Sequence, residues 1–213
     1  MRIYAVADIH GRQDKMALIR ENIARFKPDV LVVAGDITHP ARPQAGISQI
    51  GELPLPVLAI RGNSDRSRVE SLIEEHPGIH SLHLREVSVN GVDFVGVHGT
   101  IPVPFRSRVC LREKRFREQL DPLLRGHSVL VAHPPPLGFL DEVLGRFHAG
   151  SKSILEIISR VQPALFLCGH IHERPGTAFV GKTLVVNCTL ARKGAGALIE
   201  FERGRVPEAM MLA

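Results

Sequence analysis

The stretch MRIYAVADIHGR at residues 1–12 sets the pattern that decides the fold, because a run of five apolar residues, 3–7, leads directly into a polar turn. The stretch PDVLVVAGD at residues 28–36 repeats this pattern with the apolar run 30–34. Apolar runs of this length between polar or glycine residues are typical of strands buried on both faces. Three more such runs lie at 57–60, 129–132 and 164–167. The sequence therefore predicts five buried strands.

Helical periodicity fills the intervals between these runs. Apolar residues recur at spacings of three and four in four segments, at 16–26, 69–73, 116–123 and 154–161. Such spacing gathers the apolar side chains on one face of a helix. Strand and helix alternate through about residue 76, and this order favours right-handed βαβ crossovers and an open, largely parallel sheet.

After about residue 76 the pattern changes from alternating strands and helices to hairpins. Asn90 and Gly91 separate the segments 87–89 and 92–97, which predicts a hairpin on a type I′ turn because both residues tolerate positive φ. The segments 183–187, 197–202 and 206 onward, the last two separated by Arg203 and Gly204, also look antiparallel. We therefore expect an α/β fold of two sheets packed face to face with helices on their outer faces. Without an internal repeat or linker, a single domain spanning residues 1–213 is predicted.

Composition indicates an ordinary water-soluble globular protein, with 44% hydrophobic and 23% charged residues. No window approaches 18 uninterrupted apolar residues and no signal peptide is recognisable, so we expect a cytoplasmic protein that does not contact membranes. The cysteines Cys110, Cys168 and Cys188 lie far apart and form no CxxC pair. This spacing favours reduced, buried thiols over disulfides.

Positive charge is concentrated in one segment. The chain has a formal net charge of +5, and residues 106–117 hold six basic side chains against a single acidic one, Glu113. Such a segment would attract anionic substrates over a Debye length of about 8 Å at physiological ionic strength. A run of charges on a helix more commonly just faces water. The sequence leaves both interpretations open.

Each of the five buried strands ends in side chains that can bind a metal ion. In open α/β sheets, ligands gather beyond the carboxyl ends of the strands, so these segments are expected to converge on one rim. The two residues of each D-x-H or H-x-H pair project to the same side of an extended chain. The candidate metal ligands are Asp8, His10, Asp36, Asn63, His133, His170 and His172.

Two carboxylates, one amide oxygen and four imidazoles form a mixed oxygen and nitrogen set. This set suits Mn²⁺, Fe²⁺, Zn²⁺ or Co²⁺ better than Mg²⁺ or Ca²⁺. Seven donors are too many for one such ion. Divided between two ions about 3.5 to 4 Å apart with one shared carboxylate, they leave positions for water and substrate. The pattern predicts the two-metal centre of a hydrolase.

The order of these blocks, DxH, GD, GN, a single His and GHxH over residues 8–172, resembles the calcineurin-like metallophosphoesterases. The stretches PDVLVVAGD and LFLCGHIHERPG (165–176) are similar to small bacterial and archaeal members of that family. The resemblance implies a four-layer αββα fold and a metal-dependent phosphodiesterase or phosphatase. It assigns the ligands to two ions that share Asp36 as the bridge. The first ion takes Asp8, His10, Asp36 and His172, and the second takes Asp36, Asn63, His133 and His170.

The resemblance also implies the reaction and its substrates. A water or hydroxide held between the two ions would attack phosphorus in line with the leaving oxygen, without a covalent enzyme intermediate. Manganese is the favoured metal, and phosphodiesters, as small molecules or nucleotides, are the favoured substrates.

One position departs from the family pattern. The block GNH(D/E) reads Gly62-Asn63-Ser64-Asp65 here, so a serine stands where the acid for the leaving group is usually found. General acid catalysis contributes about 10²- to 10⁴-fold, and its loss should be felt most with alkoxide leaving groups. His98, in VGVHGT, is either a loop histidine after a hairpin strand or a substitute proton donor. Asp65 is interpreted as part of the local turn.

Three functions fit these observations. The leading hypothesis is a phosphodiesterase or phosphatase of small or nucleotide-like substrates. A nuclease is supported by the basic stretch 106–117, although a chain with no Trp and one Tyr has few platforms for stacking bases. A protein-binding scaffold, as in the small retromer subunit with its degenerate metal site, is the third, and the full set of seven ligands argues against it. The natural substrate, the native metal and the oligomeric state stay open.

Overall fold

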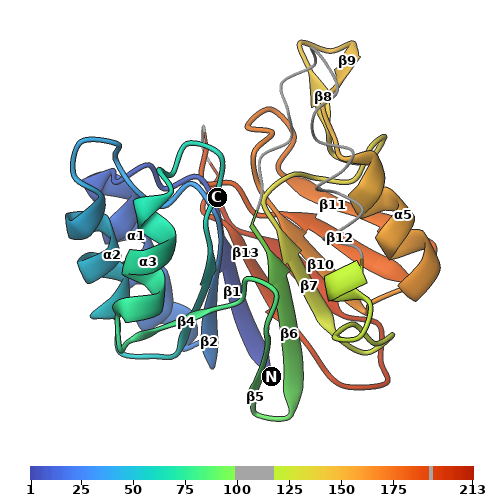
Figure 1. Ribbon diagram of the computed structural model, residues 1–213, viewed down its shortest axis with the longest axis horizontal. Coiled ribbons are helices and arrows are strands. Elements are labelled where there is room, and N and C mark those ends of the chain that lie inside the picture. Colours follow the sequence, from blue (N-terminus) through green and yellow to red (C-terminus); the bar gives the residue numbers. More distant parts are fainter. Residues whose placement is uncertain (99–117, 192–193) are drawn as a thin grey trace.

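The computed structural model describes residues 1–98, 118–191 and 194–213, and these form two six-stranded sheets (Figure 1). The first sheet has the strand order β14-β13-β1-β2-β3-β4 and the second β11-β12-β10-β7-β6-β5. The strands of the first sheet are β1 (Arg2–Val6), β2 (Val30–Ala34), β3 (Val57–Ile60), β4 (Ile79–Ser81), β13 (Ala197–Glu200) and β14 (Glu208–Met211). Those of the second are β5 (Glu86–Val89), β6 (Val92–Val97), β7 (Val129–Ala132), β10 (Leu165–Cys168), β11 (Gly176–Val180) and β12 (Thr183–Asn187).

The central strands of each sheet run parallel. In the first sheet, β1, β2, β3 and β4 are parallel. Strand β13 lies antiparallel beside β1, and β14 lies antiparallel beside β13. In the second, β6, β7, β10 and β12 are parallel, with β5 and β11 antiparallel at the two edges. Parallel strands end on the same side of a sheet, so the carboxyl ends of these strands line a common edge.

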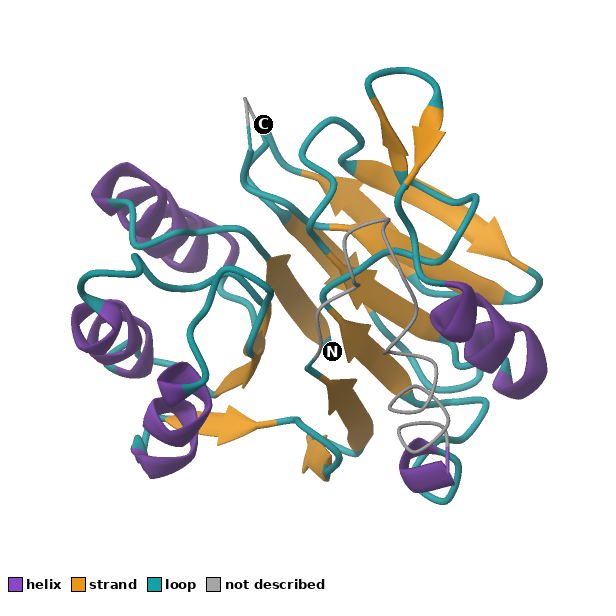
Figure 2. Cartoon of the chain, turned by 45° about the horizontal axis from the view of Figure 1, so that its top comes forward, coloured by secondary structure: helices purple, strands orange, loops and turns teal. Residues whose placement is uncertain are grey.

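Helices cover the outer faces of both sheets, which gives four layers (Figures 1 and 2). The first sheet carries α1 (Gln13–Phe26), α2 (Pro43–Gly51) and α3 (Arg68–Glu75), and the second carries α5 (Lys152–Val161). The apolar face of α1 buries Met16, Ile19 and Ile23 against Leu31 and Val33 of β2. Within the described residues, no helix is long and apolar enough to cross a membrane.

Strand β2 shows why the central strands are apolar throughout. Val30, Val32 and Ala34 belong to the core between the two sheets, whereas Leu31 and Val33 pack under the helices. Because successive side chains point to opposite faces, a strand between two apolar layers must be apolar at every position. The run of five apolar residues that predicted this strand is therefore explained by burial on both of its faces.

Most of the predicted elements are present in the structure. The five predicted buried strands are β1, β2, β3, β7 and β10, and the helical patterns at 16–26, 69–73 and 154–161 fall in α1, α3 and α5. The hairpin at Asn90 and Gly91 joins β5 to β6, with φ of 50° and 78° at the two turn residues. The predicted buried, unpaired thiols are confirmed for Cys168 and Cys188. Cys110, the basic segment 106–117 and the start of the helical pattern 116–123 lie outside the described residues.

The carboxyl-terminal part differs from the prediction in one respect. The hairpin across Arg203 and Gly204 forms as β13 and β14, but β12 is not antiparallel to β13. Instead, β12 lies in the second sheet beside β10, and β13 lies in the first sheet beside β1. All five residues of β12 are buried, so this strand needs an apolar layer on each face and takes a central position. The chain then crosses from one sheet to the other.

The sequence analysis did not predict the edge strands β4 and β11, helix α2 or one short hairpin. Helix α2 has two glycines in nine residues, and these weaken its helical pattern, although Ile47 and Ile50 anchor it to the core. The short strands β8 (Glu142–Val143) and β9 (Phe147–His148) form a separate two-stranded hairpin. A hairpin of this size shows too few residues for a periodic pattern.

Candidate metal centre

The carboxyl ends of five strands bring the predicted ligands to one rim. Asp8 and His10 follow β1, Asp36 follows β2, Asn63 follows β3, His133 follows β7, and His170 and His172 follow β10. Backbone hydrogen bonds connect the turns, from Asp8 N to the Gly35 carbonyl at 3.1 Å and from Gly169 N to the His133 carbonyl at 3.0 Å. A parallel bridge between Ala7 and Thr189 joins the two sheets beside these turns.

Four of the predicted ligands have a left-handed backbone. The φ angle is 62° at Asp8, 54° at His10, 53° at Asp36 and 69° at His170. Residues other than glycine rarely adopt positive φ, and each such residue costs on the order of 1 kcal/mol or more. The sharp change of direction keeps Asp8 and His10 at the same site just beyond β1. Strain gathered in this way is typical of functional sites.

The carboxylate of Asp8 lies at the centre of the cluster and is fully buried. Its Oδ1 atom is 3.2 Å from Nε2 of His172 and 3.9 Å from Nε2 of both His10 and His133. Its Oδ2 atom accepts a 3.1 Å hydrogen bond from the backbone N–H of His170. One buried oxygen thus faces three imidazoles that follow three different strands.

The carboxylate of Asp36 lies beside that of Asp8. Its Oδ2 atom is 3.5 Å from Nε2 of His133 and 3.9 Å from Nε2 of His10, and its Oδ1 atom accepts a 2.8 Å hydrogen bond from Ser64 N. The ligand atoms therefore form two adjacent groups, each with its atoms within 4.8 Å of one another. One group is Asp8, His10 and His172, and the other is Asp8, Asp36 and His133.

Two buried atoms test whether this cluster fits a metal ion. Nδ1 of His133 donates a 2.8 Å hydrogen bond to the Ala34 carbonyl, so Nε2 faces Asp8 and Asp36. Nε2 of His133 and Oδ1 of Asp8 are both buried without a hydrogen-bond partner. An unpaired buried polar atom costs about 1 to 3 kcal/mol. A divalent ion satisfies an imidazole nitrogen and a carboxylate oxygen together, so the residues fit a metal.

The electrostatics of the rim favour bound positive charge. Burial opposes ionisation of Asp8, but its interactions with His172 and His133 outweigh burial and lower its pKa. Burial likewise opposes ionisation of Asp36, but the nearby imidazole of His133 and the hydrogen bond from Ser64 N lower the pKa of this carboxyl well below its usual range. For His133, burial is outweighed by the two carboxylates, which raise its pKa to about 9. Both carboxylates therefore stay charged at neutral pH.

The two other predicted ligands lie next to this cluster. The ring of His170 is 5.2 Å from the ring of His133 in an edge-on arrangement. Asn63 is exposed in the turn that contains Ser64, and Ser64 Oγ lies 3.3 Å from Nδ1 of His10. The structure thus draws five of the seven predicted ligands into mutual contact, with His170 beside them and Asn63 on the adjoining turn.

Asp65 has a larger structural role than its assignment to the local turn suggests. Its buried carboxylate accepts hydrogen bonds from the backbone of Ile37 and Gly62, each at 3.0 Å, and from the backbone and hydroxyl of Thr38 at 2.9 and 2.8 Å. These bonds tie the turn after β2 to the turn after β3. Asp65 therefore holds Asp36 in place relative to Asn63.

Two further residues support the ligand turns and were missed by the sequence analysis. The buried amide of Asn187 donates to the carbonyls of Ile171 at 2.8 Å and Arg174 at 3.0 Å, and so fixes the loop of His170 and His172. Lys15 Nζ donates to the carbonyl of Asp8. Asn187 ends a buried strand, so the rule that located the metal ligands would also have found it. The contact of Lys15 has no sequence signal.

His98 lies in a separate cluster with His83 and Glu70. Nε2 of His98 is 3.1 Å from Glu70 Oε2, and its Nδ1 is buried without a hydrogen-bond partner. The centre of its ring lies 3.5 Å from that of the His83 ring, with the two planes tilted by 40°, and Nδ1 of His83 accepts the backbone N–H of His98. Burial, with the nearby charge of His83 and Arg61, lowers the pKa of His98 to about 3. To donate a proton to a substrate, His98 would have to leave Glu70.

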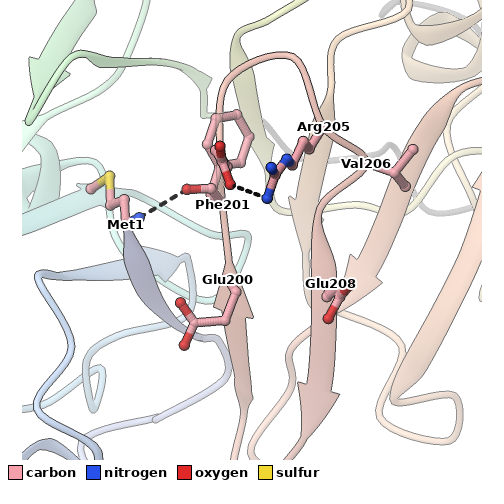
Figure 3. Close-up of a pocket in the computed structure, with 7 residues that line it drawn as sticks. Met1, Glu200, Phe201, Arg205, Val206 and Glu208 are labelled. Atoms are coloured by element: carbon pink, nitrogen blue, oxygen red, sulfur yellow. Dashed lines mark hydrogen bonds and ion pairs between the residues drawn. The ribbon is translucent and has the colours of Figure 1, made fainter.

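A surface pocket of about 380 Å³ lies at the other end of β1 (Figure 3). It is lined by Met1, Glu200, Phe201, Glu202, Arg205, Val206 and Glu208. The amino group of Met1 donates to the Phe201 carbonyl at 2.9 Å, and Arg205 pairs with Glu202 at 2.7 Å. Strand β1 rises about 3.3 Å per residue between this pocket and Asp8, so the pocket is separate from the ligand rim.

A four-layer fold with carboxylates and imidazoles gathered at the strand ends defines a metal-dependent hydrolase. Residues 1–174 match the calcineurin-like phosphoesterase family, and the chain belongs to this family. It is therefore a metal-dependent phosphoesterase, as its motifs predicted.

The chain is also similar to individual proteins of other organisms. The chain is similar to an uncharacterized protein of Methanocaldococcus jannaschii, with 32% identity over 88% of this chain and 87% of the relative. It is also 28% identical to metallophosphoesterase domain-containing protein 1 of Homo sapiens, over 89% of this chain and 66% of the relative. Its fold is similar to that of the protein TT1561 of Thermus thermophilus, with a TM-score of 0.74 and 18% identity over 99% of this chain and 98% of the other.

The role of Asp65 can be tested by Asp65→Asn. The amide NH₂ would face the N–H groups that Oδ2 now accepts, so two hydrogen bonds to a buried charge would be lost. We expect the free energy of unfolding to fall by about 3 kcal/mol, measured by urea denaturation. Asp14→Asn, at an exposed ion pair with Arg12, is the matched control and should leave stability nearly unchanged. Equal stabilities for the two variants would contradict the role of Asp65.

Stability of the metal-free protein should depend on pH through His133. Its pKa of about 9 lies above the ordinary value of 6.5, so its proton stabilises the fold below pH 6.5 and this contribution disappears as pH rises toward 9. A metal ion at Nε2 replaces the proton. The difference in Tm between Mn²⁺-loaded and chelator-treated protein should therefore widen between pH 6.5 and 9. The slope is at most about 1.4 kcal/mol per pH unit. If the difference widens equally in His133→Gln, another group is responsible.

Proposed function

We propose that the chain hydrolyses phosphate esters, phosphodiesters in particular, with two divalent metal ions at the rim formed by the five strand ends. One ion would be held by Asp8, His10, Asp36 and His172, and the other by Asp36, Asn63, His133 and His170. The observation that carries this proposal is the fully buried Oδ1 of Asp8, which has no hydrogen-bond partner and faces three imidazole Nε2 atoms.

The residues around the ligands would preorganise them. When bound, the two ions would supply an activated water and neutralise charge on the phosphate. The Ala34 carbonyl holds His133 in the tautomer that presents Nε2. Ser64 N occupies one oxygen of Asp36 and leaves Oδ2 directed at His10 and His133, which supports a bridging role for this carboxylate. Such outer contacts fix the orientation and tautomer of metal ligands.

Manganese is the metal that we favour, with iron, zinc and cobalt as alternatives. Carboxylate and imidazole ligands without thiolate suit these ions. Within the described residues, neither group of ligands around Asp8 includes a cysteine. Cys168 and Cys188 donate instead to backbone carbonyls. The donor set therefore favours harder divalent ions over those that require sulfur.

The two alternative functions have less support. The nuclease hypothesis rests on the basic segment 106–117, which lies outside the described residues. A scaffold would have no use for two adjacent buried carboxylates at one rim, because taking two like charges out of water carries a large desolvation cost. The cost of maintaining this site therefore favours an enzyme over a scaffold.

A substrate screen tests the proposal directly. Protein stripped by chelator and reloaded with Mn²⁺ would be assayed in parallel on bis(4-nitrophenyl) phosphate, 4-nitrophenyl phosphate, 2′,3′-cyclic nucleotides and DNA. We expect the aryl diester to be hydrolysed faster than the monoester. A clear preference for DNA would favour the nuclease, and metal bound without hydrolysis of any ester would favour the scaffold.

Asp36→Asn tests the bridging carboxylate. The substitution keeps the size of the side chain but removes charge that both ions would share, so activity should fall by about 100-fold or more. Far-UV circular dichroism should be unchanged. Asp93→Asn, on β6 at the end remote from the rim, is the control and should retain full activity. Activity of Asp36→Asn within tenfold of wild type would reject the bridging assignment.

The serine at position 64 predicts a strong dependence on the leaving group. Without an acid, a barrier of about 3 to 5 kcal/mol should appear only for poor leaving groups, so aryl diesters should react far faster than alkyl diesters. Rates across a series of leaving groups would give a steep slope against leaving-group pKa for wild type and a shallower one for Ser64→His.

The same series tests His98. Because Glu70 holds its Nε2, we expect His98→Ala to leave the slope unchanged. A shallow slope in wild type that becomes steep in His98→Ala would instead identify His98 as the proton donor. A shallow slope that His98→Ala does not alter would exclude both explanations.

A further inference from the structure

The turn after β3 holds Ser64 in a fixed position beside Asp36. On one side of the serine, a Cβ atom at Gly62 would lie 2.1 Å from Oδ1 of Asp36, so only glycine lets the turn approach the carboxylate this closely. On the other side, the buried carboxylate of Asp65 accepts hydrogen bonds from Thr38 N at 2.9 Å and Gly62 N at 3.0 Å. Ser64 therefore lies between two anchored residues.

Ser64 contacts residues of the two neighbouring ligand turns. Its backbone N–H donates to Oδ1 of Asp36 at 2.8 Å, and its hydroxyl oxygen lies 3.3 Å from Nδ1 of His10. The serine is half-buried, so water competes with these contacts only from one side. One residue of the β3 turn thus joins a candidate ligand that follows β2 to a candidate ligand that follows β1.

The two ring nitrogens of His10 face different groups. Nε2 lies 3.9 Å from both Oδ1 of Asp8 and Oδ2 of Asp36, whereas Nδ1 faces the hydroxyl of Ser64. An imidazole that binds a metal ion is neutral and gives one lone pair to the ion, so its single proton must be on the other nitrogen. The two carboxylates attract this proton to Nε2. Ligation by Nε2 therefore needs an acceptor at Nδ1.

His133 and His10 have different acceptors at Nδ1. The Ala34 carbonyl beside His133 can only accept a hydrogen bond, so it keeps a proton on Nδ1 of that ring. The hydroxyl of Ser64 can donate as well as accept. When Nε2 of His10 binds an ion, the hydroxyl must accept from Nδ1–H, and its own proton turns away from the ring. The hydroxyl is therefore compatible with His10 both before and after an ion is bound.

We propose that Ser64 is a positioning residue for His10, whose hydroxyl accepts the Nδ1 proton and keeps Nε2 directed at the ion that Asp8 and His172 would also hold. The inference rests on the proposed phosphoesterase function and adds a role for the residue at which the chain departs from the family pattern. Serine is not among the side chains that serve as general acids at neutral pH. At this position the chain carries a group that acts on a metal ligand and not on the leaving group.

Three variants test the proposal. Ser64→Ala removes the hydroxyl and keeps the backbone N–H bond to Asp36, and Ser64→Thr retains a hydroxyl at the same place. Ser67→Ala is the matched control, because Ser67 is an exposed serine three residues further on whose side chain makes no capping hydrogen bond to α3. Each protein would be stripped by chelator and titrated with Zn²⁺ by calorimetry.

We expect Ser64→Ala to weaken one Zn²⁺-binding step by about tenfold or more, because loss of a hydrogen-bond partner of a metal-binding histidine commonly lowers metal affinity by about 10- to 100-fold. The other step should change by less than about threefold, since His133 keeps its own acceptor. Ser64→Thr should restore the affinity to within about threefold of the wild type, and Ser67→Ala should match the wild type.

The ring proton of His10 gives a second readout that depends on neither affinity nor activity. Long-range ¹H–¹⁵N spectra of the Zn²⁺-loaded protein distinguish a protonated Nδ1 from a metal-bound Nε2, and His10→Gln assigns the signals. We expect an observable Nδ1 proton in the wild type and in Ser64→Thr. In Ser64→Ala this proton should exchange with water too fast to be observed. A serine that only stabilised the turn would not change this signal, because the backbone contact with Asp36 is retained.

The outcomes separate this proposal from the proposed function. Equal Zn²⁺ affinities and an unchanged Nδ1 proton in Ser64→Ala would overturn the positioning role and leave the metal centre intact. Equal weakening of both steps would mean that the serine acts through Asp36, and this result would also overturn the role. A wild-type chain that binds no Zn²⁺ would reject the metal centre and this inference together. Zn²⁺ binding that depends on the Ser64 hydroxyl, in a protein that hydrolyses no ester, would support the inference and reject the function.

Discussion

The burial of two carboxylates at one place, Asp8 and Asp36, is the constraint on which the rest of the site depends. An ionised carboxylate inside a protein costs several kcal/mol unless opposite charge or hydrogen bonds compensate it. Their neighbours at ion-pair distance are imidazoles, whose Nε2 atoms lie 3.2 to 3.9 Å away. In the metal-free protein a proton on His133 supplies part of the compensating charge, because the two carboxylates raise its pKa to about 9. A divalent ion between the carboxylate oxygens and the imidazole nitrogens would replace this proton and compensate both carboxylates, so the chemistry of the site follows from the electrostatics of its burial.

The fold provides this arrangement by making two sheets end at the same edge. Apolar central strands such as β2 and β10 form a close-packed interior that holds the strand ends still. Left-handed residues then turn the chain immediately beyond the strands. Asp65 and Asn187 secure the turns with hydrogen bonds to backbone groups far away in sequence. The strain is thus confined to a few residues and supported by a rigid framework, as preorganised sites require. The β8–β9 hairpin extends the same framework outward.

Sequence patterns predicted the elements in which burial repeats regularly along the segment. The apolar run of β2 indicated a strand because both of its faces are buried, and the spacing in α5 indicated a helix because only one face is. Helix α2 was not predicted because its two glycines weaken the helical periodicity of the segment. Tertiary contacts of Ile47 and Ile50 stabilise this helix in the folded protein. Strand β12 is antiparallel to β11, as its pattern predicted, but it does not join the carboxyl-terminal hairpin of β13 and β14. An apolar sequence indicates that a strand is buried but not which strands lie beside it. Local propensity has no information on that choice.

By itself, the sequence determined the central strands, the helices α1, α3 and α5, the seven candidate ligands and the family. It did so because each ligand stands at the end of a recognisable strand, and parallel strands must end on the same side. Only the tertiary structure decided that Glu70 holds His98, that Asp65 joins the turns after β2 and β3, and that the β8–β9 hairpin projects from the body of the protein. These features arise from contacts between residues about 28 apart in the first two cases, and from loop packing in the third. Periodicity describes a residue's local environment, whereas the partner of a buried polar group is chosen by the packing of the whole chain.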